Sequence, residues 1–108
     1  MGQPRTGDKE FAMWHDTAIP YSYRIVHDRD MVTHMPPQLG KTGLYHHRTE
    51  VWYTNNMTLD ADFHICRQAE GPSCSGSLLS NISYDDHGLY FVAEMPAWGA
   101  LGCPTNWL

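Results

Sequence analysis

The first twenty residues have the spacing of polar and apolar side chains that is typical of a short helix. Lys9 to Asp16 has an acidic residue in the first turn and apolar residues at helical spacing, and Pro20 interrupts the pattern. Asp8 can accept a hydrogen bond as the N-cap, and Thr6 is the weaker alternative. The pattern therefore predicts a helix over most of residues 8–18.

Strand patterns follow this helix. Residues 21–26 alternate aromatic or aliphatic side chains with polar ones, and residues 44–54 are rich in Tyr, Val, Trp and Thr. Pro36-Pro37 and Gly40 predict a loop between these two segments. We expect strands near 21–27 and 44–54, a short third strand at 61–66, a loop at 71–77, and either a short helix or an extended segment at 85–92.

Length and charge exclude several classes of protein. A chain of 108 residues forms one domain at most. The net charge of −5 and the scattered set of seven Lys or Arg argue against a nucleic-acid partner. No stretch approaches the ~18 apolar residues that predict a membrane span. The start of the chain as written lacks the charged and then apolar pattern of a signal peptide.

Two features nonetheless indicate a secreted protein. Asn56-Met57-Thr58 and Asn81-Ile82-Ser83 are acceptor sequons for glycosylation. Of the three cysteines, Cys66 and Cys74 flank a short polar segment that suits a local disulfide. Cys103 is left over, which predicts a partner elsewhere or a free thiol, and we favour a partner in a missing N-terminal region. The alternative is three reduced cysteines in a cytosolic protein.

Seven histidines raise the question of a metal site. His27, Asp30 and His34 are close enough in sequence to share an ion, and His46 and His47 form an adjacent pair. However, the chain has no H-E-x-x-H motif and no C-x-x-C pair, and adjacent histidines on a strand point to opposite faces. We therefore expect no metal ion.

Three sequence motifs and a later histidine occur in a characteristic order. The motifs are GQPRTGDKEFA at 2–12, HDRDMVTHMPP at 27–37 and LYHHRTEVWY at 44–53, and Asp86-His87 follows them. Together they resemble the fungal-type (class 3) triacylglycerol lipase family. The departures from that family are Thr33 in place of Pro, which is expected to loosen a loop, Gly88 in place of Leu and Val92 in place of Gly.

The resemblance implies an acid and a base for a Ser-His-Asp triad. In the family, the Asp of the second motif is the acid and the later His is the base, which carries over to Asp30 and His87. In this chemistry a Ser hydroxyl attacks the ester carbonyl, the His removes its proton, and the carboxylate stabilises the imidazolium. Asp28, Asp85 and Asp86 are the other candidate acids, and we interpret the last two as loop or capping residues.

The nucleophile of such a triad is absent from the sequence. It stands on a G-x-S-x-G elbow in α/β hydrolases, and no such motif occurs here. Residues 71–76 come nearest, but Ser75 stands where a Gly is required and no apolar strand precedes them. The resemblance thus implies an α/β fold: the C-terminal part of an α/β-hydrolase fold, without the N-terminal strands and nucleophile elbow. Residues 1–108 then form a partial class 3 lipase domain with a tail at 104–108.

The expected function follows from this resemblance. The parent is a secreted, extracellular serine lipase of lipid metabolism that hydrolyses carboxylic esters of glycerolipids at a lipid–water interface, without a cofactor. This chain carries the acid and the base and is inactive without the other half of its domain. One alternative is a catalytically inactive truncated product. Another is a small disulfide-linked protein that binds a partner chain through an exposed sheet edge.

Overall fold

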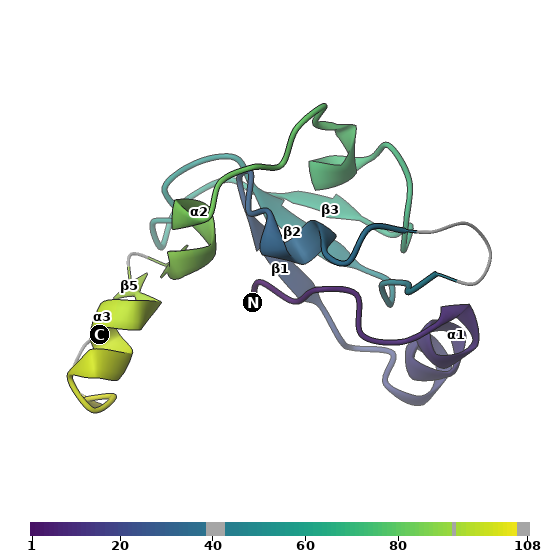
Figure 1. Ribbon diagram of the computed structural model, residues 1–108, viewed down its shortest axis with the longest axis horizontal. Coiled ribbons are helices and arrows are strands. Elements are labelled where there is room, and N and C mark those ends of the chain that lie inside the picture. The colour runs from purple at the N-terminus through teal and green to yellow at the C-terminus, as the bar shows by residue number, and fades with distance from the viewer. Residues whose placement is uncertain (39–42, 92, 106–108) are drawn as a thin grey trace.

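The computed structural model describes residues 1–38, 43–91 and 93–105. A three-stranded sheet lies at its centre, a helix packs at one end, and a smaller group of short elements lies at the other end (Figure 1). In chain order the elements are α1 (Lys9–Ala18), β1 (Arg24–His27), the 3-10 turn η1 (Val32–His34), β2 (Glu50–Tyr53), β3 (His64–Cys66), the 3-10 turn η3 (Cys74–Ser77), α2 (Asp85–Gly88), β4 (Leu89–Tyr90), β5 (Ala93–Glu94) and α3 (Met95–Ala100).

Helix α1 begins and ends close to the predicted residues. The Asp8 side chain accepts a hydrogen bond from the Phe11 backbone N–H at 2.8 Å, so Asp8 rather than Thr6 is the N-cap. Ala12 is buried, and the helix ends at Ala18, two residues before Pro20. No helix in the described part of the chain is long and apolar enough to cross a membrane.

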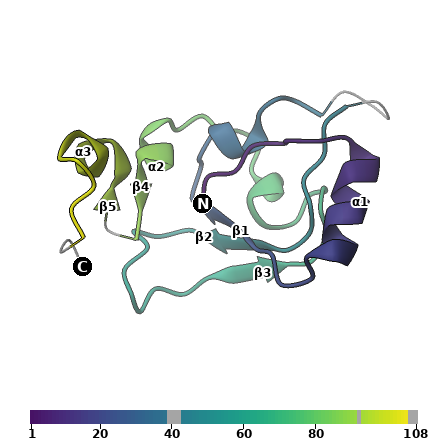
Figure 2. The same ribbon diagram turned by 90° about the horizontal axis from the view of Figure 1, so that it is seen from below.

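The central sheet is mixed, with strand order β1-β2-β3 (Figure 2). β1 pairs in parallel with β2 from Arg24↔Glu50 to His27↔Tyr53, and β2 pairs antiparallel with β3. The predicted strands exist, but their predicted bounds are too long. Tyr21 and Tyr23 are exposed before β1 begins, and residues 61–63 precede β3 without pairing.

The segment at 44–49 does not join the sheet as predicted, because other groups use its backbone. The Arg24 guanidinium donates from Nε to the His47 carbonyl oxygen at 2.9 Å. Tyr45 makes one isolated bridge to Gly7. The segment is therefore held beside the N-terminal residues rather than in a strand.

Charged side chains lie within the molecule beside this sheet. Arg24 is 1% exposed and pairs with Glu50 at 3.3 Å. Arg5 forms two hydrogen bonds with the Glu70 carboxylate, both at 2.9 Å. Burial alone would raise the pKa of Glu70, but hydrogen bonds from His46 and Arg5 outweigh it and hold that pKa well below its usual value. The first pair joins β1 to β2, and the second connects the N-terminal segment to the residues that precede η3.

The apolar core is small and lies at the end of the sheet nearest α2. Tyr53, Met57 and Tyr90 form its buried cluster, and Phe91 packs against it while partly buried. Trp52 of β2 is only partly buried. Many large apolar side chains are instead exposed, among them Met13, Trp14, Tyr21, Leu59, Phe63, Ile65 and Leu79. Exposure on this scale is more than single-chain soluble proteins usually show.

The expected disulfide between Cys66 and Cys74 is formed, with the two Cα atoms 6.0 Å apart. The disulfide links β3 to η3. The segment at 71–77, which was expected to be a loop, ends in this 3-10 turn. Cys103 is free and exposed. Residues 85–91 combine both predicted forms, because α2 leads directly into β4. Gly40, Val92 and the end of the predicted tail lie outside the described residues.

Candidate active site

Asp30 is buried immediately beyond β1, and its carboxylate accepts three hydrogen bonds. Its side chain is 0% exposed. Oδ1 accepts from the Val32 backbone N–H at 2.9 Å, and Oδ2 accepts from the Tyr90 hydroxyl at 2.7 Å. The third bond joins Oδ2 to the Nδ1 atom of His87 at 3.0 Å. The two residues that the family resemblance selected, Asp30 and His87, are therefore in direct contact.

The contact with Asp30 determines which nitrogen of His87 carries the proton. A carboxylate can only accept hydrogen bonds, so Nδ1 donates, and the neutral ring keeps a lone pair at Nε2. The His87 side chain is 32% exposed, and no described residue is hydrogen-bonded to its Nε2. A half-exposed imidazole with this tautomer is suited to act as a general base.

Backbone hydrogen bonds hold α2 against the loop that carries Asp30. Ser83 makes a parallel bridge with Asp30. The Ser83 N–H donates to the Arg29 carbonyl oxygen, and the Met31 N–H donates to the Ser83 carbonyl oxygen, both at 3.1 Å. The Asp86 carboxylate accepts from the Arg29 backbone N–H at 3.1 Å. Asp86 lies in the first turn of α2 rather than in a loop or at the cap, which is Tyr84, and its carboxylate accepts from the Arg29 backbone rather than from the His87 ring.

Thr33 also contributes to this loop. Its side chain is buried, and its hydroxyl donates to the Asp30 carbonyl oxygen at 2.8 Å. We expected a looser loop because this residue replaces a Pro. The structure shows instead that the hydroxyl closes the turn with a hydrogen bond that Pro could not make.

Tyr90 is part of the site, although sequence reasoning assigned it only to the core. Besides donating to Asp30, its hydroxyl accepts from the His27 backbone N–H at 3.3 Å. Burial, together with the adjacent Asp30 carboxylate, raises the pKa of Tyr90 well above its ordinary value. The hydroxyl therefore remains a neutral donor that holds the Asp30 carboxylate in place. Nothing in the sequence marks Tyr90 for this role except its position three residues after His87.

Gly2 packs against the His87 ring, a contact that sequence reasoning also missed. It is buried, its φ is +59°, and its N–H donates to the Ile25 carbonyl oxygen at 3.0 Å. A Cβ atom at this position would lie 2.9 Å from Cε1 and 3.0 Å from Nδ1 of His87. Only a residue without a side chain leaves room for the imidazole at its present distance from Asp30.

We predict that Gly2→Ala lowers the turnover number of the longer protein that contains this chain. The added methyl group must displace the His87 ring, and a displacement of about 1 Å can cost about 10²-fold in rate. Gly99→Ala is the control, because no atom lies within 4 Å of a Cβ built at Gly99. Steady-state hydrolysis of a soluble ester measures both variants. Equal rates for Gly2→Ala and Gly99→Ala would contradict the prediction.

The residues that we considered as metal ligands are not brought together. Both ring nitrogens of His27 contact backbone carbonyl oxygens, of Asp86 at 3.1 Å and of Asn55 at 2.9 Å, and the Asp30 carboxylate is occupied as described. His34 Nε2 is buried and has no hydrogen-bond partner among the described residues, but His34 does not form a group of possible metal ligands with His27 and Asp30. His46 and His47 lie outside the strand in which we placed them, and both are buried.

Comparison with known proteins agrees with this geometry. Residues 1–40 match the protein family described as lipase (class 3). The chain is 35% identical to "Lipase ZK262.3" of Caenorhabditis elegans. The alignment has 133 positions and covers 97% of this chain and 38% of that protein. It is 39% identical over 92 residues to a lipase of Rhizomucor miehei, covering 83% of this chain and 24% of that protein.

The chain belongs to the class 3 lipase family. Solved structures of the family share its fold: the lipase of Rhizopus microsporus var. chinensis superposes with a TM-score of 0.74 at 36% identity, over 86% of this chain and 31% of that one. A triacylglycerol lipase whose catalytic centre is described as a serine protease triad superposes with a TM-score of 0.70 at 36% identity, over 87% of this chain and 34% of that one.

These superpositions confirm the predicted fold class, a part of an α/β-hydrolase fold. The chain spans less than half the length of the curated relatives that it matches first.

Proposed function

We propose that this chain supplies the acid, Asp30, and the base, His87, of a serine lipase site that hydrolyses carboxylic esters of glycerolipids. The observation that carries the proposal is the 3.0 Å contact between a buried carboxylate and a half-exposed imidazole whose Nε2 is unpartnered among the described residues. The lipase names of the relatives support the reaction class, and the triacylglycerol lipase with a serine protease triad supports a triad and a triacylglycerol substrate.

In this proposal the nucleophilic serine belongs to a part of the longer protein outside these 108 residues. His87 Nε2 accepts the serine proton as the hydroxyl oxygen attacks the ester carbonyl carbon. The buried Asp30 carboxylate then stabilises the imidazolium through Nδ1–H, and Nε2–H donates the proton to the departing alkoxide. Water attacks the acyl-serine in a second cycle of the same transfers, releasing the fatty acid.

The test of the proposal is hydrolysis of a short-chain ester by this chain alone and by the longer protein. We predict no turnover above background for the chain alone, because a base without a nucleophile and oxyanion donors has nothing to activate. The longer protein should turn over the ester and be inactivated by a serine-directed phosphonate. Robust turnover by the chain alone would contradict the placement of the nucleophile elsewhere.

The rival proposal of a non-catalytic binding protein has one observation in its favour. β3 pairs on one side only among the described strands, and the Phe63 and Ile65 side chains next to and within it are exposed. Such an edge can pair with another chain. A longer protein that hydrolyses esters with His87 intact but not with His87 removed would exclude this rival.

We also propose that the parent protein is secreted, and this leads to a prediction about its two sequons. The disulfide supports an oxidising compartment. Asn56 is exposed, whereas the Asn81 side chain donates to the Ser75 carbonyl oxygen at 3.3 Å and its Oδ1 is buried. Protein secreted from eukaryotic cells should therefore carry glycan at Asn56 and not at Asn81. Glycopeptide mass spectrometry, with Asn56→Gln as the control, checks this; glycan at Asn81 alone would contradict it.

A further inference from the structure

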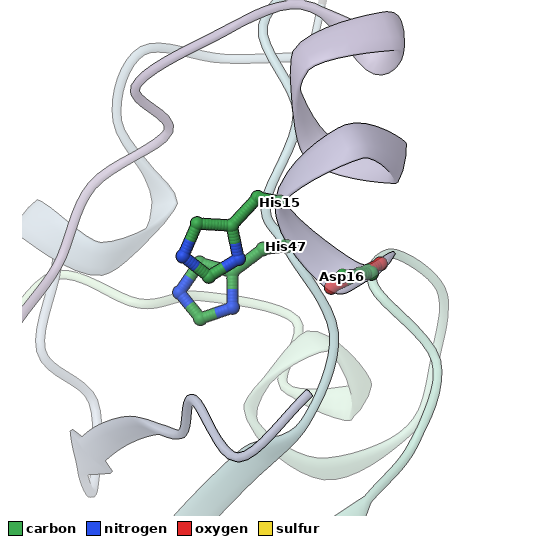
Figure 3. Close-up of side chains that lie close together, drawn as sticks. All are labelled: His15, Asp16 and His47. Atoms are coloured by element: carbon green, nitrogen blue, oxygen red, sulfur yellow. The ribbon is translucent and has the colours of Figure 1, made fainter. Parts of the chain in front are cut away.

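A cluster of three potential metal ligands lies at the C-terminal end of α1, separate from the Asp30–His87 pair. His15 and Asp16 come from the last turns of α1, and His47 comes from the segment that precedes β2. Figure 3 shows the two imidazole rings lying one over the other with Asp16 beside them. The ring centroids are 4.1 Å apart, and one ligand atom from each of the three residues lies within 4.8 Å of the others.

The hydrogen bonds of this cluster are incomplete. His15 Nδ1 is buried and has no hydrogen-bond partner among the residues that the structure describes. Both nitrogens of His47 face oxygen acceptors, Nδ1 the Arg48 carbonyl oxygen at 2.8 Å and Nε2 the Gln3 Oε1 atom at 3.1 Å. A neutral imidazole can donate from one nitrogen only, so one of these two nitrogen–oxygen contacts lacks a proton.

A metal ion that replaces the Arg48 carbonyl oxygen as the partner of His47 Nδ1 would resolve both features. We propose that His15, Asp16 and His47 bind a zinc ion, with Nδ1 of each imidazole and one Asp16 oxygen as ligands. The Nε2–H of His47 then donates to Gln3 Oε1, which is the outer contact that orients most metal-ligating histidines. His15 Nδ1 gains the partner that it lacks.

The donor set selects the class of ion. Two imidazole nitrogens and one carboxylate oxygen suit Zn²⁺, whereas Mg²⁺ and Ca²⁺ prefer oxygen ligands alone. Three protein ligands leave the fourth tetrahedral position to water. Ligand atoms about 2 Å from a tetrahedral zinc ion are about 3.3 Å from one another, so the ligand atoms must approach one another by up to about 1.5 Å when the ion binds.

Arg48 is the group that competes with the ion. Its Nε donates to Asp16 Oδ2 at 3.0 Å, and its backbone N–H donates to Asp16 Oδ1 at 2.7 Å. The Arg48 side chain is 60% exposed, so its ion pair with Asp16 contributes little and can be given up. The negative end of the α1 dipole also favours a cation at this position. A bound ion would tie the end of α1 to the segment before β2.

The experiment is titration of Zn²⁺ into chelator-treated protein, with binding measured by calorimetry. Thermal unfolding is then measured with and without the ion. The exposed thiol of Cys103 is a competing zinc ligand, so every protein carries Cys103→Ser. We expect one ion per chain and a higher midpoint temperature with Zn²⁺ but not with Mg²⁺. His15→Ala should lower the affinity for zinc at least tenfold, and Asp16→Asn should also lower it. His64→Ala, which removes an exposed imidazole from β3, should leave it unchanged.

Arg48→Ala tests whether Asp16 binds the ion or only stabilises the fold. Removing the competing guanidinium should tighten zinc binding several-fold, although the same change lowers stability in the absence of zinc. Circular dichroism without zinc verifies that each variant is folded, and Asp16→Asn replaces His15→Ala if the latter is not. The proposal is overturned if the parent protein binds no zinc, if the His15 and Asp16 variants bind it equally well, or if Arg48→Ala weakens binding.

Discussion

Replacing His87 with Ala in the longer lipase should lower kcat for a soluble ester by about 10⁴-fold or more. The imidazole is the group that receives the serine proton, and no described residue offers another base within hydrogen-bond reach of Asp30. A loss of 10⁴-fold corresponds to about 5.5 kcal/mol of transition-state stabilisation. KM should change much less, because His87 acts on the reacting proton rather than on the bound lipid.

His64→Ala is the matched control for this experiment. His64 is exposed on β3, and its ring lies 5.8 Å from that of Trp52. It removes one imidazole without touching Asp30, so its turnover should equal that of the parent. Full activity of the His87→Ala protein would disprove the assignment of the base, while equal loss in both variants would point to unfolding rather than to chemistry.

Asp30→Asn should lower kcat by about 10⁴-fold while leaving the shape of the side chain almost unchanged. The present carboxylate accepts from the Val32 N–H, the Tyr90 hydroxyl and the His87 Nδ1–H. An amide has a single acceptor oxygen, so its NH₂ group must face at least one of these donors. If it faces His87, it stabilises the tautomer with the proton on Nε2, which cannot accept the serine proton.

Asp85→Asn is the control for Asp30→Asn. Asp85 is an exposed acid in the first turn of α2, two residues from His87. This substitution removes the same charge close to the base, but Asp85 makes no hydrogen bond to the His87 ring. Turnover should therefore stay within about twofold of the parent. Loss of activity in Asp85→Asn and not in Asp30→Asn would reassign the acid. Tyr90→Phe, which removes one donor to Asp30, should give an intermediate loss.

Local chemistry in the sequence was sufficient for several features. Asp8 followed by acidic and apolar residues at helical spacing and then by Pro20 specifies α1, because capping and proline sterics act within a few residues. The eight-residue separation of Cys66 and Cys74 indicated their disulfide for the same reason. The motif order identified the family and nominated Asp30 and His87, and their contact across 57 positions agrees with that nomination without testing their roles.

Strand bounds were not determined locally. The pattern at 44–54 favours a strand throughout, yet only residues 50–53 join the central sheet, because the buried Arg24 takes up the carbonyl of His47. A side chain that lies more than twenty positions away along the chain decides which backbone groups remain for the sheet. Propensity in a short window carries no information about such a competitor.

The same reason explains what the sequence did not reveal about the sites. Gly2, Tyr90 and the His15–Asp16–His47 cluster depend on which residues the fold brings within 3 to 5 Å, and no motif spaces them along the chain. The sequence by itself determined the family, the helix, the disulfide and the candidate acid and base. Only the tertiary structure decided that Asp30 accepts three donors, that Gly2 leaves room for the His87 ring, and that two distant histidines stack beside Asp16, because these are contacts between segments that are remote in the chain.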